Sequence, residues 1–395
     1  MVPKGWEVLH LKDVASKIQD GNYGADYPKA DEFVASGIPF LTSKVIGGIG
    51  TINPDKFDYI KEEKHQSLKK AQIVAGDILF TNRGANVGTI AIVPDYIATA
   101  NIGPQLTLVR CNDCILKEYL FQFLRGSFFQ KQIQQRDSGS AMNFFGIKDT
   151  ERFKVLVPSL SEQKRIAQIL STWDKAISVT EKLLANSQQQ KKALMQQLLT
   201  GKKRLLDENG VRFNGKWEKK LLSDVADVYQ PKTISQSMMS DSGYPVYGAN
   251  GVIGFYQEFN HETEQIAVTC RGSTCGIVNW TQAKSWITGN AMVINTDNYS
   301  YVSKKFLFYT LNGSDLKYLI SGSGQPQITG KIKTHIINLP CIEEQQKIAT
   351  VLSAADAEIY TLEKKLACLR DEKKALMQQL LTGKRRVKVD EAVAE

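Results

Sequence analysis

The feature that most limits how this chain can fold is an internal repeat. Residues 158–204 align without gaps on residues 340–386, and 26 of the 47 positions are identical. Within this alignment, residues 191–202 recur unchanged as residues 373–384. Each copy opens with a proline and closes with a glycine followed by basic residues, and these are helix boundary signals. Both copies are therefore predicted to be long helices.

Each predicted helix carries a stripe of residues whose steps alternate between four and three, as in a coiled coil. In the first copy the apolar members of the stripe are Ile166, Leu170, Trp173, Ile177, Leu184, Leu194 and Leu198. In the second copy they are Ile348, Leu352, Ala355, Ile359, Leu362, Leu366, Leu369, Leu376 and Leu380. Polar members such as Thr180, Ser187 and Lys191 could fix the register of pairing, at some cost in stability.

Such a stripe has two kinds of surface that it could cover. It could lie on the helix's own domain, as in an ordinary amphipathic helix. A helix of about 40 residues would be ~60 Å long, however, and this exceeds the size of a small domain. We therefore expect the two repeated helices to pair with each other.

A weaker repeat precedes each helix. Trp6 and Arg83-Gly84 in the first region match Trp217 and Arg271-Gly272 in the second. Shared landmarks imply one shared fold, and the divergent stretches between them imply different surfaces. The predicted order is a first domain, a helix, a second domain, and a helix with a charged tail, at residues 1–157, 158–204, 205–339 and 340–395.

Inside the two domains the local pattern is mixed. Short β-branched or apolar runs bounded by glycine and proline predict strands at residues 78–80, 89–93, 266–269 and 292–294. Helices are predicted at residues 116–135 and 304–319, and residues 201–216 are expected to form an exposed connection. The predicted fold class is therefore α+β, with two similar mixed domains separated by two long helices.

Composition bounds the class of protein. The 395 residues include 50 Lys+Arg against 41 Asp+Glu, which gives a net charge of +9 and fits either nucleic-acid binding or an ordinary bacterial enzyme. No apolar run approaches the ~18 residues of a membrane span, and the N-terminus lacks the apolar core of a secretory signal. The six cysteines are too few and too irregular for a disulfide framework. We expect a cytoplasmic protein.

Motifs for catalysis or metal binding are missing or incomplete. The segment 210–217 nearly spells a phosphate-binding loop, but Trp217 stands where a Ser or Thr hydroxyl is needed for magnesium. Cys111 and Cys114 lack the further ligands of a zinc site, so they are interpreted as structural cysteines. The four histidines show no grouping. The chain is therefore predicted to have no catalytic residues, no metal site and no bound cofactor.

Candidate nucleic-acid contacts lie in polar and glycine-rich loops. Arginine can donate two hydrogen bonds to guanine and asparagine can pair with adenine, while glycine permits close approach to phosphate. The alternative for the two Arg-Gly segments is a β-turn that carries a solvated arginine. The candidates are Ser43, Lys44, Arg83, Asn86, Asn143, Asn250, Arg271, Ser273, Thr274, Gln325 and Gln327.

The whole arrangement resembles the specificity subunit of type I restriction–modification enzymes. The resemblance rests on the duplicated helix ends at 194–202 and 376–384, and on three segments of the second domain, 244–251, 271–273 and 321–329. The first domain departs from the family at residues 141–145, where the last of these motifs would read Gly-Gln-Pro-Gln-Ile. That departure weakens any transfer of base-contacting roles to this loop.

The resemblance implies a division of labour that agrees with the missing chemistry. Each domain would be a target-recognition domain that reads one half of a split, asymmetric DNA site. The two helices would pair antiparallel, set the distance between the halves and generate a pseudo-twofold axis. Two methyltransferase subunits would dock on this scaffold and methylate adenine N6 with S-adenosylmethionine. Two motor-nuclease subunits would join them for cleavage that depends on ATP and magnesium.

Two other classes of protein remain open from the residues alone. One is a coiled-coil scaffold that carries two ligand-binding domains with no specificity for DNA. The other is an enzyme whose site has no recognisable motif. Salt-dependent DNA binding would argue against the first class, and activity of the isolated chain would support the second.

Overall fold

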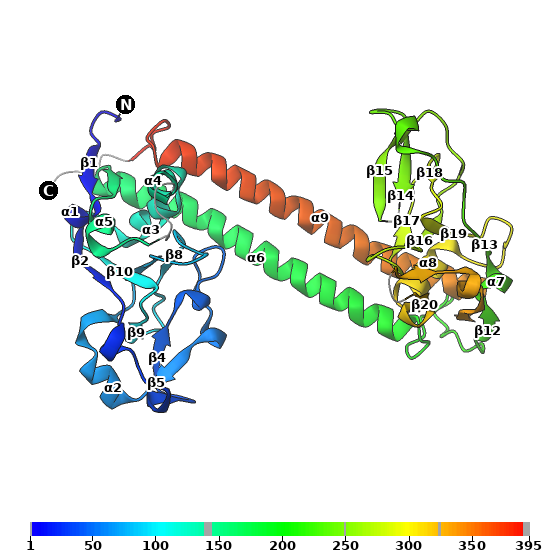
Figure 1. The fold of residues 1–395 in the computed structure, drawn as a ribbon, viewed down its shortest axis with the longest axis horizontal. Coiled ribbons are helices and arrows are strands. Elements are labelled where there is room, and N and C mark those ends of the chain that lie inside the picture. The colour runs from blue at the N-terminus through cyan, green and yellow to red at the C-terminus, as the bar shows by residue number, and fades with distance from the viewer. Residues whose placement is uncertain (1, 138–143, 249, 323–324, 390–395) are drawn as a thin grey trace. The chain divides into compact units, whose positions relative to one another are not determined.

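The computed structural model describes residues 2–137, 144–248, 250–322 and 325–389, and the chain divides into two compact units. Unit 1 contains residues 1–181 and 365–395, and unit 2 contains residues 182–364. Two long helices, α6 (Leu160–Leu198) and α9 (Ile342–Leu380), each contribute one half to each unit. Each unit also holds one domain of mixed helices and sheets (Figure 1). The predicted α+β class with two domains and two long helices is confirmed.

The domain of unit 1 is closed by its first and last strands, because β1 (Glu7–His10) pairs antiparallel with β11 (Lys154–Val157). A four-stranded sheet has the order β2-β10-β7-β8, with strands Ala15–Asp20, Leu106–Cys111, Ile78–Thr81 and Ile90–Ile92. A five-stranded sheet has the order β3-β5-β4-β9-β6, with strands Phe33–Val34, Asp58–Ile60, Ile38–Leu41, Ala100–Ile102 and Gln72–Ile73. The helices are α1 (Leu11–Val14), α2 (Glu62–Ser67), α3 (Lys117–Arg125), α4 (Ser127–Asp137) and α5 (Ile147–Glu151).

The domain of unit 2 repeats this plan. Its first strand β12 (Glu218–Leu221) pairs antiparallel with its last strand β22 (Ile336–Leu339). A four-stranded sheet has the order β13-β19-β16-β17, with strands Asp227–Tyr229, Ala291–Asn295, Ile266–Thr269 and Val278–Trp280. Smaller sheets have the orders β15-β14-β18 and β20-β21, with strands Gly251–Tyr256, Tyr244–Gly248, Trp286–Ile287, Ile320–Ser321 and Gln327–Ile328. Its helices are α7 (Leu222–Val225) and α8 (Lys304–Asn312).

The two domains share the strand order of their four-stranded sheets and differ in their other sheets. Both four-stranded sheets are antiparallel, and their strands follow the same relative order. The five-stranded sheet of unit 1 and the three-stranded sheet of unit 2 each contain a parallel pair, β4 with β9 and β14 with β18. The sheet in unit 1 has two additional short strands at its edges, β3 and β6, whereas the sheet in unit 2 has three strands. The common fold expected from the shared landmarks is therefore present, with local elaboration of the first domain.

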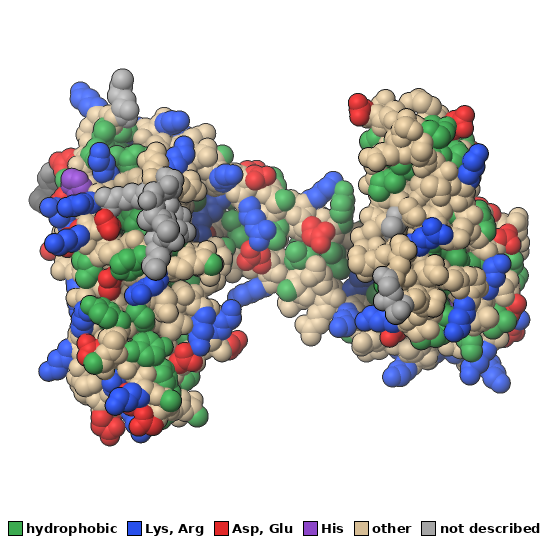
Figure 2. Space-filling view, viewed as in Figure 1, with side chains coloured by type: hydrophobic (Ala, Val, Ile, Leu, Met, Phe, Trp, Pro, Cys, Tyr) green, Lys and Arg blue, Asp and Glu red, His purple; other side chains and the backbone are tan. Residues whose placement is uncertain are grey.

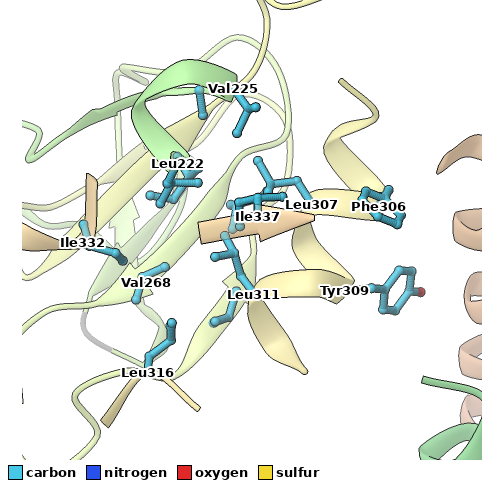
Figure 3. Packing of buried hydrophobic residues seen from close by; sticks show 14 of the residues in the cluster. Leu222, Val225, Val268, Phe306, Leu307, Tyr309, Leu311, Leu316, Ile332 and Ile337 are labelled. Atoms are coloured by element: carbon cyan, nitrogen blue, oxygen red, sulfur yellow. The ribbon is translucent and has the colours of Figure 1, made fainter. Parts of the chain in front are cut away.

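The largest hydrophobic cluster of each unit lies where the domain packs against the ends of the two long helices. In unit 2 the central strand β16 is buried along its whole length, and Val268 packs near Leu307 and Leu311 of α8 and Ile337 of β22 (Figure 3). The same cluster includes residues of both long helices, namely Leu198, Ile348, Ala349 and Leu352. In unit 1 the corresponding cluster includes Ile166, Ala167, Leu170, Leu380 and Leu381. The repeated helices thus form part of each hydrophobic core.

Two helices predicted from the sequence are shorter in the structure. The helix predicted at 116–135 is broken at Gly126 into α3 and α4. Gly126 is extended, with φ −74° and ψ 158°, and a Cβ there would stand 3.0 Å from the side chain of Leu381, the residue after α9, so this close approach favours glycine. The helix predicted at 304–319 ends at Asn312, because Gly313 caps it and the chain then turns.

The connection at 201–216 is only partly exposed. Leu205 packs against the core of unit 2, and the Arg204 guanidinium donates two hydrogen bonds to the buried Glu344 carboxylate at 2.5 and 2.6 Å. Most of the segment is exposed, as expected, but Arg204 and Leu205 are half-buried. The reason is that the basic residues after the helix satisfy a buried acid, which cannot remain unpaired.

Polar contacts join the two long helices inside each unit and recur 182 residues apart in sequence. In unit 1 the Asp174 carboxylate accepts from Lys373 Nζ at 2.5 Å, and in unit 2 the same repeat positions are filled by Asp356 and Lys191, which form an ion pair. The partners run antiparallel, since Asp174 and Glu181 of α6 meet Lys373 and Arg370 of α9, respectively.

The same correspondence holds at the start of each helix. Glu162 accepts from Trp6 Nε1 at 3.3 Å and from Arg386 Nε at 2.7 Å, while Glu344 accepts from Trp217 Nε1 at 3.1 Å and from Arg204. The neighbouring Gln163 and Gln345 side chains accept from the backbone N–H of Leu116, just before α3, and of Ser303, just before α8, at 2.8 Å in both cases. The repeated Glu-Gln pair therefore ties each helix to its own domain.

Every residue of the two predicted apolar stripes is buried or half-buried. The ends of the stripes, such as Leu170 and Leu352, are fully buried against a domain core, whereas middle positions such as Leu184 and Leu362 are half-buried. Each stripe therefore packs against both of the surfaces that the sequence allowed. It covers the domain at the helix ends and faces the other helix along the middle.

Candidate nucleic-acid interface

The two Arg-Gly segments form the same turn in both domains. In unit 1 the turn joins β7 to β8, and Gly88 N–H donates to Thr81 O at 2.9 Å. In unit 2 it joins β16 to β17, and Gly276 N–H donates to Thr269 O at 2.8 Å. The four glycines of these turns have φ between +84° and +93°, a region that favours glycine, so the sequence pattern reflects a backbone requirement.

The turn also meets an equivalent segment from later in each domain. Phe145 N–H donates to Asn82 O at 2.8 Å, and Ile328 N–H donates to Cys270 O at 2.9 Å. Isolated bridges join Arg83 to Phe144 and Arg271 to Gln327. Phe144 and Phe145, the described residues of the segment that departs from the family motif, therefore have the same backbone pairing as Gln327 and Ile328 in the second domain.

The side chains of the two arginines are used differently. Arg83 is half-buried, donates from Nε and Nη2 to Pro104 O at 2.9 and 2.6 Å, and lies over the Phe144 ring. Arg271 is exposed, and its side chain makes no hydrogen bond or ion pair with a described residue. Arg83 therefore fixes a loop, whereas the Arg271 guanidinium can donate to a ligand.

The structure brings several other predicted contact residues to the same edge of unit 2. Gly272 N–H donates to Pro326 O at 3.0 Å, so the exposed Gln325 and Gln327 flank the arginine turn. Thr288 N–H donates to Tyr247 O where β14 and β18 end, and this places the start of the turn that carries the exposed Asn250 near the same end of the sheet. Ser273 is exposed and Thr274 is half-buried in the arginine turn itself.

In unit 1 fewer of the predicted contact residues are both exposed and unpaired among the described residues. Asn86 is exposed in the arginine turn, and Ser43 is half-buried after β4. Gly103 N–H donates to Leu41 O, so the end of β4 meets the segment that accepts from Arg83. Lys44 is exposed but is paired with Asp58 at 2.7 Å. The predicted Asn143 lies outside the described residues.

A buried polar network beneath the Arg83 turn was missed by sequence reasoning. Asp20 Oδ1 accepts from Thr107 Oγ1 at 2.6 Å and from Asn82 Nδ2 at 3.2 Å. The side-chain oxygens of Asn22 and Asn82 are buried without a hydrogen-bond partner among the described residues. The only signal was a run of polar residues at strand ends, which the sequence does not distinguish from solvated loop residues.

The histidines are held by structural contacts. His65 is buried, with Nδ1 2.5 Å from Asn101 Oδ1. His261 stacks on Tyr229, and burial lowers its pKa, as burial also lowers the pKa of His335. Within the described ranges no group of three or more His, Cys, Asp or Glu side chains could hold a metal ion. The predictions that the chain is non-catalytic and binds no cofactor remain predictions.

Surface charge does not by itself locate an interface. On the face shown in Figure 2, basic side chains are scattered over both units among acidic ones. Among the helices of the part of the chain that the structure describes, none is long and apolar enough to cross a membrane. The arrangement of the arginine turns is therefore the more informative feature.

Comparison with known proteins gives one consistent family. The family described as a type I restriction modification DNA specificity domain matches the chain twice, at residues 3–186 and 214–368. Two relatives from Methanocaldococcus jannaschii are the proteins assigned as the MjaX and MjaVIII type I restriction enzyme specificity subunits. They are 28% and 25% identical, and each alignment covers 98% of this chain, with 95% and 94% of the relative covered.

Solved structures show the same fold. The S subunit of a type I restriction–modification system from M. genitalium superposes with a TM-score of 0.66 at 14% identity, covering 96% of both chains. A chain from a study of complex assembly and conformational transition of the type I system superposes with a TM-score of 0.56 at 18% identity, covering 98% of this chain and all of the other. With both halves of the sequence matched and the fold shared, the chain belongs to the family of type I restriction–modification specificity subunits.

Proposed function

We propose that this protein reads a bipartite, asymmetric DNA site and holds the methyltransferase and nuclease subunits of its system on that site. The observation that carries the proposal is the pair of equivalent arginine turns. They have the same backbone hydrogen bonds but different neighbours, Phe144 in one domain and Gln327 in the other. Two domains with one backbone and two surfaces can read two different half-sites.

Direct reading of bases requires unpaired donors and acceptors at the protein surface. Arg271, Gln325, Gln327 and Asn250 are exposed in unit 2 and come from loops at one edge of the domain. In unit 1 the exposed Asn86 lies in the corresponding turn, whose arginine is already bonded to Pro104. The second half-site would therefore be read with an arginine and the first without its counterpart.

The scaffold role follows from how the repeated helices are attached. Each helix is tied to its own domain through Glu162 or Glu344 and to the other helix through the Asp174 or Asp356 ion pair. Two methyltransferase subunits would bind this duplicated frame and methylate adenine N6 with S-adenosylmethionine. Two motor-nuclease subunits would bring ATP and magnesium, so that catalysis resides on the partners.

The proposal is tested by exchanging residues 205–339 for the corresponding segment of a relative with a known methylated motif. The expected result is a methylated motif in which one half-site is replaced and the other is retained, because each domain keeps its own core. Sequencing of methylated DNA from cells that carry each chain is the measurement. A motif changed in both halves, or no bipartite motif for the unmodified chain, would contradict the proposal.

The rival scaffold without DNA specificity is tested on the isolated chain. Binding to a duplex that carries the motif should weaken as salt rises, with a slope set by the number of phosphates contacted. A duplex with one half-site scrambled should bind more weakly at the same salt. Equal binding to both duplexes at every salt concentration would favour the scaffold without DNA specificity.

A further inference from the structure

A buried carboxylate in unit 1 has no counter-charge among the described residues. Asp20, the last residue of β2, is 9% exposed and accepts hydrogen bonds only from neutral side chains. Two arginines belong to the neighbouring part of the sheet, but Arg83 donates to Pro104 O and Arg110 pairs with Asp77. A carboxylate is charged at neutral pH, and a buried charge without a partner is strongly unfavourable. A positive charge is therefore expected beside Asp20.

The same end of the sheet carries buried amide oxygens without donors. Asn22 and Asn82 are 1% and 0% exposed, and their Oδ1 atoms have no hydrogen-bond partner among the described residues. Gln105 Oε1 is buried and unpartnered in the same way. Asn82 Nδ2 donates to the Asp20 carboxylate at 3.2 Å, and Asn22 Nδ2 donates to a backbone carbonyl at 3.3 Å. Turning either asparagine amide over would bring two oxygens together, so the unpartnered asparagine atoms are acceptors.

Strand pairing places these side chains on one face of the sheet. Asn82 N–H donates to Gln105 O at 2.9 Å, two residues beyond the pairing of Thr107 with β7. Because side chains alternate along a strand, Asn82 and Gln105 lie on the face of Thr107. Asp20 is opposite Thr107, and Asn22 follows it by two residues, so both share that face. One carboxylate and three amide oxygens therefore gather at this end of the sheet.

We propose that this cluster of Asp20, Asn22, Asn82 and Gln105 binds a hard metal cation of the calcium type through side-chain oxygens. Calcium takes about six to eight oxygen ligands, accepts carboxylate and amide oxygens together and tolerates irregular geometry, whereas magnesium keeps most of its water. Buried waters would donate to the amide oxygens but would leave the Asp20 charge uncompensated. A cation satisfies the amides and the charge together, and the half-buried Gln105 leaves it a side open to solvent.

The sequence prediction of no metal site rested on the spacing of cysteines and histidines, and this cluster contains neither. The second domain has no such charge at the matching positions. Cys270 precedes its arginine turn as Asn82 does in the first domain, and counting along the paired strands places Gln230 where unit 1 has Asp20. Gln230 Nε2 donates to Cys270 Sγ at 3.1 Å and to Gly289 O at 3.3 Å. A neutral glutamine needs no cation, so the ion belongs to unit 1 alone.

The test is isothermal titration calorimetry of the full chain, freed of metal with a chelator and then titrated with calcium chloride or magnesium chloride alone. The unmodified chain should bind calcium at a single site, and magnesium about tenfold more weakly or less. Asp20→Asn should weaken calcium binding by about tenfold or more, because it removes the charged ligand and keeps the shape of the side chain. The matched control Asp31→Asn changes an exposed carboxylate of the same domain and should bind calcium as the unmodified chain does.

Thermal denaturation of the same preparations gives a second readout. Calcium should raise the transition temperature of the unmodified chain relative to chelator, because it binds only the folded state, and it should not raise that of Asp20→Asn. In chelator Asp20→Asn should be at least as stable as the unmodified chain, since it removes an uncompensated buried charge.

Three outcomes would overturn the inference. The first is the absence of calcium binding by the unmodified chain, which would mean that ordered water satisfies the amide oxygens. The second is calcium binding that Asp20→Asn leaves unchanged. The third is a loss of stability in Asp20→Asn that is equal in calcium and in chelator, which would make Asp20 a hydrogen-bond acceptor only. None of these measurements uses DNA, so their failure leaves the proposed function untouched.

Discussion

The same ion pair between the long helices occurs in both units, but it is more exposed to solvent in unit 2 than in unit 1. The side chains of Asp174 and Lys373 are 18% and 7% exposed, whereas those of their counterparts Asp356 and Lys191 are 40% and 20% exposed. Asp174 also accepts from Arg125 and Gln122, while Asp356 accepts from the Tyr309 hydroxyl. The repeat therefore fixes which residues meet, and the domain packed against them decides how strongly they are held.

The arginine turns show the same division between backbone and side chains. Both turns need glycine at the same positions, and both carry the same bridge to a later segment. Phe144 and Pro104 engage Arg83, while Gln327 stands opposite an exposed Arg271. Two copies of one fold can thus differ in which side chains remain free for a ligand, with little change in the backbone.

The largest expected effect comes from a charge placed in each core. Leu170→Asp and its repeat counterpart Leu352→Asp each bury a carboxylate at a position that is 0% exposed. An unpaired buried carboxylate costs several kcal/mol or forces the site open. Limited proteolysis mapped by mass spectrometry should show new cleavage in unit 1 for the first variant and in unit 2 for the second.

The control for this comparison is Leu183→Asp, since Leu183 lies on the same helix but is 49% exposed. It should leave both the thermal transition and the cleavage pattern unchanged. Cleavage spread equally over both units in the Leu170 and Leu352 variants would mean that the two units unfold together. Native behaviour of both variants would contradict the assignment of these residues to the cores.

An intermediate effect is expected at the buried ion pairs. Asp174→Asn keeps hydrogen-bonding atoms but leaves the Lys373 ammonium buried without its counter-charge, and this should cost about 3 kcal/mol. Asp356→Asn should cost about 1 kcal/mol, because its pair is more exposed to solvent. Chemical denaturation of the full chain measures both. Equal losses would show that the difference in exposure has no energetic consequence.

The Asp174 variant also has a defined pH dependence. Burial raises the pKa of Asp174, but Arg125, Gln122 and Lys373 together outweigh burial, and the pKa lies below its ordinary value. Burial and the nearby Arg125 charge lower the pKa of Lys373, although its pair with Asp174 opposes both. A lowered carboxyl pKa stabilises the fold above the unfolded pKa of about 3.9, and this contribution is lost as pH falls through the folded value. The stability difference between Asp174→Asn and the unmodified chain should therefore shrink below about pH 4.

The sequence predicted the long helices and the central strands, because their residue patterns are periodic or repeated. The long helices followed from the repeat, and the strands around Ile78 and Ile266 followed from apolar runs between glycines. The break at Gly126 could not be predicted, since it depends on the approach of Leu381, which follows α9 and lies about 250 residues later in the chain. The pairing of Arg204 with Glu344 could not be predicted for the same reason, because it is a long-range contact.

The candidate site was predicted less completely, for a related physical reason. Arg83 and Arg271 look alike in sequence because both precede glycine in the same turn. Which of them is free depends on residues about 20 and 60 positions away, Pro104 in one domain and Gln327 in the other. Such partners are set by the tertiary fold, so local sequence identified the turn but not the state of its arginine.

The last comparison concerns these two arginines, where one substitution should affect DNA binding and the other should affect stability. Arg271→Ala should weaken binding to the methylated motif by about 1–3 kcal/mol if the guanidinium contacts guanine, with no change in thermal stability, because its side chain bonds to no described residue. Arg83→Ala should instead lower stability by about 1–3 kcal/mol, because Pro104 O loses both donors.

Fluorescence anisotropy with the motif duplex at several salt concentrations, beside thermal denaturation of the same preparations, measures both quantities. If Arg271 contacts only phosphate, the salt slope falls by about 1 and discrimination against a scrambled half-site is kept. If Arg83→Ala weakens DNA binding while leaving stability intact, the bonds to Pro104 are exchanged for DNA contacts on binding. In that case the two domains would read DNA with equivalent arginines, and the contrast between a fixed and a free side chain would hold only for the unbound protein.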